Sequence, residues 1–222
     1  MRTQTYIVIF FIALAAFSCK KKEEKPSTEP AVAATTPTPT SGLNENSNRY
    51  VKFTLGSQSY SYIPVTGNVW SSSSGGLSTQ PFLPNYYSVY STINGGSNFY
   101  ISIGDSTRQT SPVSEAFFKS LLAVKSFPFS KESMWSSKQV GVFISVKNPA
   151  NNEVYKSVNP VNNTSFQSGS SFIINENFFY TSQGSSYLDC IFKATVNCKL
   201  YSGTGDSIQL SNGEIVSTLT KF

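Results

Sequence analysis

The chain has 222 residues, with 17 Lys and Arg against 12 Asp and Glu, and it contains no histidine. The lack of histidine excludes Ser-His-Asp and Cys-His catalytic pairs, the HExxH zinc site and general base catalysis by imidazole. From Arg49 onward the cations are scattered singly, whereas nucleic-acid binding requires a concentrated basic face. The sequence therefore predicts no nucleic-acid partner, and it shows no motif for a cofactor or a metal.

A short apolar run precedes a cysteine near the N-terminus. Residues 6–17 are apolar and follow the positive charge of Arg2, but a bilayer-spanning helix needs about 20 such residues. Cys19 follows the run after a single residue, Ser18, and is itself followed by Lys20-Lys21-Lys22. This junction resembles a bacterial lipoprotein signal peptide spanning residues 1–18. An ordinary secretory signal with an incidental cysteine is the alternative.

The resemblance implies a lipid anchor on Cys19, in which the cysteine carries a diacylglyceryl group and an N-acyl chain. Several acyl chains hold a protein on a membrane durably, whereas one chain binds only marginally. Lys22-Glu23-Glu24 also resembles the signal that directs lipoproteins of the Bacteroidota to the outer face of the outer membrane. We therefore expect display on the cell surface, with the periplasmic face of that membrane as the alternative.

Composition divides the rest of the chain into a linker and one domain. Residues 19–48 contain four prolines among threonines, alanines and charges, without a hydrophobic period, so we expect a disordered tether. Residues 49–222 are rich in aromatic residues, Ser, Asn and Gly, and their number suits one domain.

Apolar and polar residues alternate repeatedly within this domain. Val51, Phe53 and Leu55 are an example, and Gly, Pro and Asn separate the alternating runs. The pattern predicts a mainly β fold, an antiparallel β-sandwich or a partly open barrel. The expected strands cover residues 50–55, 59–63, 86–93, 99–103, 140–146, 153–157, 172–174, 188–196 and 207–210.

One short helix is predicted over residues 112–125. Ser111 suits the N-cap because its hydroxyl can accept a free backbone N–H of the first turn. Pro112 suits the first turn because the N–H that proline lacks has no acceptor inside the helix. Phe117, Leu121 and Val124 then follow at helical spacing.

The last part of the domain carries a family resemblance. A strand with phenylalanine, Asp189 to Val196, leads through a Gly-rich turn to the segment Ile208 to Ile215, in which a strand is expected to end at Asn212-Gly213. This layout resembles the C-terminal pattern of small uncharacterised outer-membrane lipoproteins of the Bacteroidota. The resemblance implies a single β-rich domain and brings no known activity.

Two cysteines lie within one predicted strand. Eight residues of extended chain between Cys190 and Cys198 span about 26 Å, and a disulfide requires Cα atoms about 4.4–6.8 Å apart. Both cysteines have the parity of Phe192 and Val196. We therefore expect two buried free thiols; a bend that brings them together is the alternative.

Aromatic residues in flexible polar segments are the candidate ligand-binding residues. Trp70 stands in a run of Ser and Gly, Trp135 is followed by two serines, and Tyr86 and Tyr87 lie near the first segment. Rigid rings among adaptable polar residues are typical of binding surfaces, and aromatic faces stack on sugar rings. Inward packing of both tryptophans is the alternative.

These features favour a non-catalytic module that binds a glycan or a protein. The alternative is a carboxylate-dependent hydrolase of extracellular polysaccharide, because two of the domain's eight acids could meet in space. An exposed aromatic platform would favour binding, and a cleft with two facing acids would favour hydrolysis.

Overall fold

Eleven antiparallel strands and one short helix make up the part of the chain that the structure describes. The computed structural model describes residues 42–63, 69–77, 84–92, 97–105, 114–130, 140–162, 166–181 and 183–221, which belong to one compact unit, Pro39–Phe222. The strands are β1 (Tyr50–Leu55), β2 (Gln58–Tyr62), β3 (Val69–Leu77), β4 (Pro84–Thr92), β5 (Ser97–Asp105), β6 (Lys125–Ser126), β7 (Val140–Lys147), β8 (Val154–Lys156), β9 (Ser171–Thr181), β10 (Leu188–Tyr201) and β11 (Ser207–Lys221), and the helix is α1 (Glu115–Leu121).

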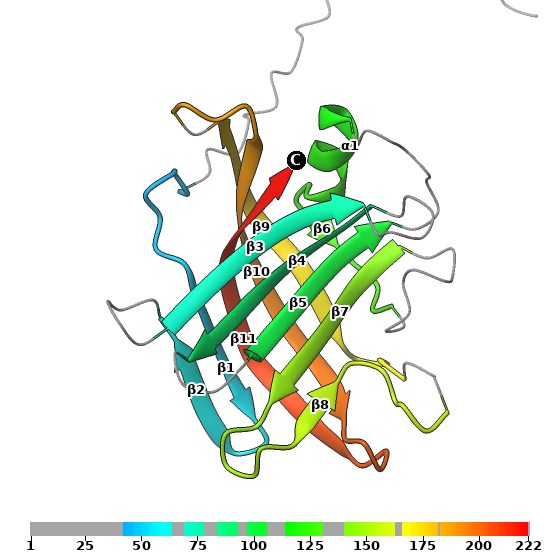
Figure 1. Ribbon diagram of the computed structural model, residues 1–222. Coiled ribbons are helices and arrows are strands. Elements are labelled where there is room, and N and C mark those ends of the chain that lie inside the picture. The colour runs from blue at the N-terminus through cyan, green and yellow to red at the C-terminus, as the bar shows by residue number, and fades with distance from the viewer. Residues whose placement is uncertain are drawn as a thin grey trace, which may run out of the picture. The chain divides into compact units, whose positions relative to one another are not determined.

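The strands form one sheet that folds over on itself without closing into a barrel. Its order is β2-β1-β11-β10-β8-β7-β5-β4-β3, and β9 pairs with both β10 and β6. β3, β4, β5 and β7 form the front layer, and β3 and β4 contact β11 in the layer behind (Figure 1). The fold is therefore mainly β and sandwich-like, as the alternating sequence predicts.

The core lies between the two layers because alternate residues of β1, β5, β7 and β10 point inward. Val51, Phe53 and Leu55 are buried on β1, as expected from their spacing. Phe53 joins the layers, since its ring centroid lies 5.4 Å from that of Phe99 on β5. Cys190 and Cys198 are free thiols, fully buried on the inward face of β10, which confirms the expectation of two core thiols.

β11 continues well beyond the point where the sequence predicts its end. Asn212-Gly213 forms a β-bulge inside the strand, because Ser211 and Asn212 together face Asn197 of β10. Asn212 has a positive φ of 51°, and its N–H donates to the Asn197 side-chain oxygen (3.0 Å). A Cβ on Gly213 would lie 2.7 Å from the carbonyl oxygen of Val196, so this position requires glycine.

The helix is shorter than predicted and begins at a different cap. Ser114, not Ser111, is the N-cap, and its hydroxyl accepts the Phe117 N–H (3.1 Å). Val124 lies outside the helix and is 52% exposed. Phe117 and Leu121 are buried as the helical spacing predicts, and α1 lies at the end of the sheet where β11 ends (Figure 1).

A segment that the sequence assigned to the linker contacts the domain. We name Gly42–Arg49 the N-terminal strap. The Gly42 N–H donates to a Glu176 carboxylate oxygen on β9 (3.0 Å). The Arg49 guanidinium donates through Nε to the Thr218 hydroxyl on β11 (2.8 Å) and through Nη2 to the Tyr180 hydroxyl on β9 (3.4 Å). The strap therefore spans from β9 to β11, across the outer face of β10.

Two apolar residues are buried on this outer face, outside the main core cluster. Ile191 of β10 is fully buried and Val216 of β11 is 3% exposed, although neither belongs to the core between the layers. Ile191 is paired with Phe178 of β9 and Thr218 of β11, the residue that Arg49 contacts. The strap thus crosses the face of the sheet on which these two buried residues lie.

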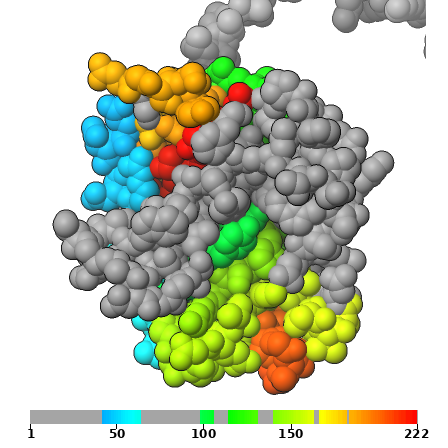
Figure 2. All heavy atoms as spheres, viewed as in Figure 1, coloured from blue at the N-terminus to red at the C-terminus, as the bar shows by residue number. Residues whose placement is uncertain are grey.

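Three different segments form hydrogen bonds with the backbone groups on the outer edge of β7. Pro128 and Ser130 exchange backbone hydrogen bonds with Val142 (2.9 and 3.0 Å), and β8 pairs with the end of β7. Between them, Ser157 donates its N–H to the Ile144 carbonyl (2.9 Å), and its hydroxyl accepts the Ile144 N–H (3.1 Å). The Ser157 hydroxyl therefore takes the place of a backbone carbonyl oxygen in the hydrogen-bond ladder along β7. Figure 2 shows β7 and β8 at the lower end of the front face.

Ser157→Ala should destabilise the domain by about 1–3 kcal/mol, because it leaves the buried Ile144 N–H without its acceptor. Urea denaturation followed by tryptophan fluorescence measures this loss. Ser207→Ala, at an exposed serine at the start of β11, is the matched control and should change stability by less than about 0.5 kcal/mol. Equal stability of the two variants would contradict the role assigned to the Ser157 hydroxyl.

Candidate ligand-binding site

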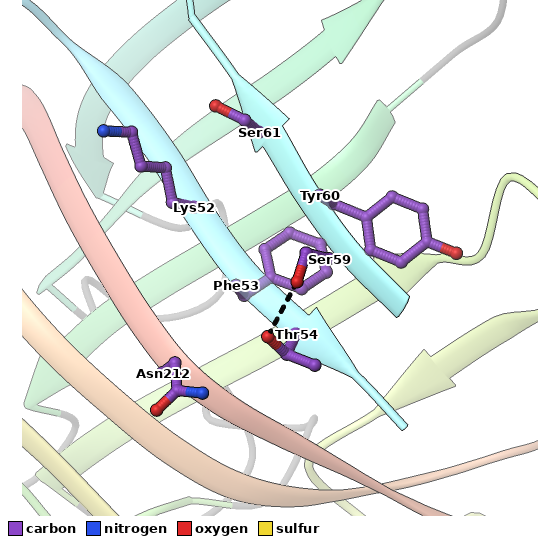
Figure 3. A pocket seen from close by; sticks show the side chains of 7 residues that line it. All are labelled: Lys52, Phe53, Thr54, Ser59, Tyr60, Ser61 and Asn212. Carbon is purple, nitrogen blue, oxygen red and sulfur yellow. Dashed lines mark hydrogen bonds between the residues drawn. The ribbon is translucent and has the colours of Figure 1, made fainter. Parts of the chain in front are cut away.

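A hollow of about 540 Å³ opens beside the edge strand β2. Three strands contribute to it: β1, β2 and the bulge of β11. Figure 3 shows the Lys52 and Asn212 side chains extending from neighbouring strands, with the Thr54 and Ser59 hydroxyls joined by a hydrogen bond of 3.2 Å. The lining residues are Lys52, Phe53, Thr54, Ser59, Tyr60, Ser61 and Asn212.

Strand register explains why polar groups gather there. Lys52 is paired with Ser61, and Thr54 with Ser59, so these four side chains share the face opposite to the buried Phe53. Asn212 joins them because the bulge places an extra residue of β11 beside β1. The result is a hollow that offers an ammonium group, hydroxyls and an amide.

The aromatic residues of the hollow are engaged in the core. The Tyr60 ring centroid lies 5.4 Å from that of Phe53, and the Tyr60 hydroxyl donates to the Asn148 side-chain oxygen (3.1 Å). Tyr60 therefore fixes β2 to the β7–β8 turn and does not supply a free stacking platform.

A hydrogen-bonded charge cluster lies next to the hollow on the same face. Glu214 is paired with Lys52 in the sheet, its Oε1 accepts the Tyr50 hydroxyl, and its Oε2 lies 3.5 Å from the Lys193 ammonium. The hydrogen bond from Tyr50 holds the pKa of Glu214 below its ordinary value, and the ammonium groups of Lys193 and Lys52 add to this. Burial, followed by the hydrogen bond to Glu214, raises the pKa of Tyr50 to about 12.

Lys52 contacts the cluster through its neighbour on β1. Its Nζ lies 4.7 Å from the centroid of the Tyr50 ring, a cation–π contact. Both carboxylate oxygens of Glu214 are taken by other groups, and no ion pair within 4 Å joins Lys52 to an acid among the described residues. The Lys52 ammonium is therefore available at the rim of the hollow.

The structure places the candidate residues from the sequence elsewhere or leaves them outside the described residues. Val69–Leu77 forms strand β3 and not a flexible loop, so Trp70 stands in a strand paired with β4. Tyr86 pairs with Ile103 and Tyr87 with Ser102, so the two tyrosines occupy consecutive positions of β4. Trp135 and Cys19 lie outside the described residues.

Sequence reasoning missed the hollow and the charge cluster. The outward positions of β1 carry the relevant signal: Tyr50, Lys52 and Thr54 alternate with the buried apolar residues. A second signal is Asn212-Gly213, a dipeptide that suits a bulge as well as a turn. The pairing of these residues depends on strands far apart in the sequence.

The described residues also bear on thiol reactivity, metal binding and membrane spanning. Burial raises the pKa of the Cys190 and Cys198 thiols, so both stay protonated and poorly nucleophilic. Within the described ranges, no group of three or more acidic or cysteine side chains is arranged to hold a metal ion. None of the helices described there has the length and apolar character needed to cross a membrane.

Comparison with known proteins gives no match: no protein-family model, no curated protein and no solved structure is similar to the chain.

Tyr50→Phe should raise the pKa of Glu214, because it removes the hydrogen bond that contributes most to the lowered value. A carboxyl with a lowered pKa stabilises the fold above its unfolded pKa, and this contribution is lost as the pH falls. The variant should therefore lose more stability at pH 7 than at pH 2.5.

Carboxyl-carbon NMR of Glu214 and urea denaturation at the two pH values measure both effects. Tyr187→Phe, at a tyrosine that is 46% exposed, is the control and should leave the Glu214 titration unchanged. An unshifted Glu214 titration in Tyr50→Phe would contradict the assigned hydrogen bond.

Proposed function

We propose that this protein is a lipid-anchored lipoprotein of the outer membrane, displayed on the cell surface, whose β domain binds a glycan or a protein without catalysis. The polar hollow beside β2 carries the proposal. Its hydroxyls, amide and ammonium converge on one open volume and come from paired strands, so the groups are held in place before a ligand arrives.

The lining chemistry favours a glycan over a protein. Sugar hydroxyls both donate and accept hydrogen bonds, and the Ser, Thr and Asn side chains of the hollow do the same. The cores of protein interfaces, in contrast, are enriched in aromatic and apolar residues. The rings of Phe53 and Tyr60 pack against each other, so the hydrogen-bonding groups of the hollow come from its Lys, Ser, Thr and Asn side chains.

The electrostatics beside the hollow favour binding over hydrolysis. A glycoside hydrolase needs a carboxyl with a raised pKa, because this group must deliver a proton to the leaving oxygen. The pKa of Glu214 is lowered instead, and hydrogen bonds to Tyr50 and Lys193 occupy both of its oxygens. Glu214 therefore suits a structural role, although the hydrolase remains the competing proposal.

The anchor part of the proposal rests on the N-terminal sequence. Cys19 follows an apolar run of lipoprotein type, and Lys22-Glu23-Glu24 resembles a surface-export signal of the Bacteroidota. The strap adds that the chain joins the domain along β9 to β11 and not at the hollow.

A glycan array probed with the full chain in detergent tests the binding proposal. Asn212→Gly should weaken binding of the best glycan about three- to tenfold, since it removes one amide while glycine keeps the positive φ. Asn152→Gly is the matched control, because Asn152 also has a positive φ (59°) but lies in the β7–β8 turn. An array without any bound glycan would eliminate the glycan ligand, and release of reducing ends would support the hydrolase.

Cys19→Ala should transfer the protein from the membrane fraction to the soluble fraction, because the acylated sulfur and amino group are lost. Fractionation of expressing cells, with radiolabelled palmitate incorporation, measures the change. Ser18→Ala keeps the cysteine and should leave the protein in the membrane. Unchanged membrane partition of Cys19→Ala would refute the lipid anchor.

A further inference from the structure

We infer that the hollow takes an acidic saccharide, a sugar with a carboxylate such as a uronic or sialic acid, and that Lys52 contacts that carboxylate. The inference rests on the proposed glycan-binding function and specifies the class of glycan. It depends on the position of Lys52, on the engagement of the neighbouring acid and on the remaining lining groups.

Lys52 is the charged residue that lines the hollow. It lies in the middle of β1, which is paired on both edges, so its backbone is fixed by β2 and β11. The side chain is steadied by the Tyr50 ring 4.7 Å from Nζ, which leaves the donors of the ammonium free to bind an oxygen anion.

The acid opposite Lys52 does not neutralise it through an ion pair. Glu214 receives the Tyr50 hydroxyl on Oε1 and the Lys193 ammonium on Oε2. Lys52 still contributes to the lowered pKa of Glu214, so the two charges interact through space without direct contact. A ligand carboxylate would provide the direct partner that Glu214 does not.

The other lining groups suit the body of a sugar. The hydroxyls of Thr54, Ser59 and Ser61 and the amide of Asn212 surround the approach to Lys52, and no carboxylate is among the described residues that line the hollow. An acidic sugar would therefore meet one cation and several neutral hydrogen-bonding groups without like-charge repulsion. A carboxylate is smaller and carries less charge than a phosphate, which matches a single lysine better than a cluster of basic residues.

Two matched ligand pairs test the inference with the full chain in detergent. Trigalacturonic acid is compared with its carboxyl-reduced form, and sialyllactose with lactose, by isothermal titration calorimetry at low salt. At least one acidic member should bind about tenfold more tightly than its neutral counterpart, and added salt should reduce that difference. A sulfated galactose trisaccharide is the third ligand, and it tests whether the hollow prefers a carboxylate to another anionic group.

Lys52→Gln should abolish the preference for the acidic member over the neutral one, whereas Lys52→Arg should retain it. Lys147→Gln, the same charge change on β7, should leave the preference intact. Retention of the preference in Lys52→Gln, or tighter binding of the sulfated sugar than of either carboxylated one, would overturn the inference.

The outcomes separate this inference from the proposed function. Equal binding of acidic and neutral members, or binding of neutral array glycans alone, overturns the acidic specificity and leaves glycan binding in place. Failure of every glycan on the array and in the calorimeter overturns both.

Discussion

The close contact between Gly213 and Val196 sets the course of the two longest strands. A side chain at Gly213 would collide with the backbone of Val196, so β10 and β11 approach at a distance that only glycine permits. The bulge at Ser211–Asn212 lies next to this contact, and β11 pairs with β10 on one edge and with β1 on the other. Both layers of the fold and the position of β2 depend on this pair of strands.

The same bulge connects the fold to the candidate site. An uninterrupted strand would alternate strictly, whereas the extra residue turns Asn212 toward β1 with a left-handed backbone. The hollow then forms between that amide and the outward side chains of Lys52 and Thr54. A feature that shapes the sheet thus also supplies one of the polar groups offered to a ligand.

Sequence reasoning succeeded where the alternation of buried and exposed residues lies within a single strand. The parity of Cys190 and Cys198 within β10 predicted two buried thiols, because period-two burial is local information. It failed for Val69–Leu77, since serine and glycine have low strand propensity and pairing with β4 overrides that preference. It also failed at Asn212, where strands on both edges convert a turn-like dipeptide into a bulge. The sequence did not predict the hollow for a related reason, because its three strands meet only in the folded chain.

The N-terminal strap has a mechanical consequence. A pull on the chain from its N-terminal side reaches the Gly42 and Arg49 hydrogen bonds before it reaches β1. β1 is paired on both edges and buries Phe53 between the layers, so it resists extension more strongly than the strap. Under load the strap would detach first, while β1 stays paired with β2 and β11. A pull on residues 42–49 would therefore extend this segment of the chain before the sheet itself yields.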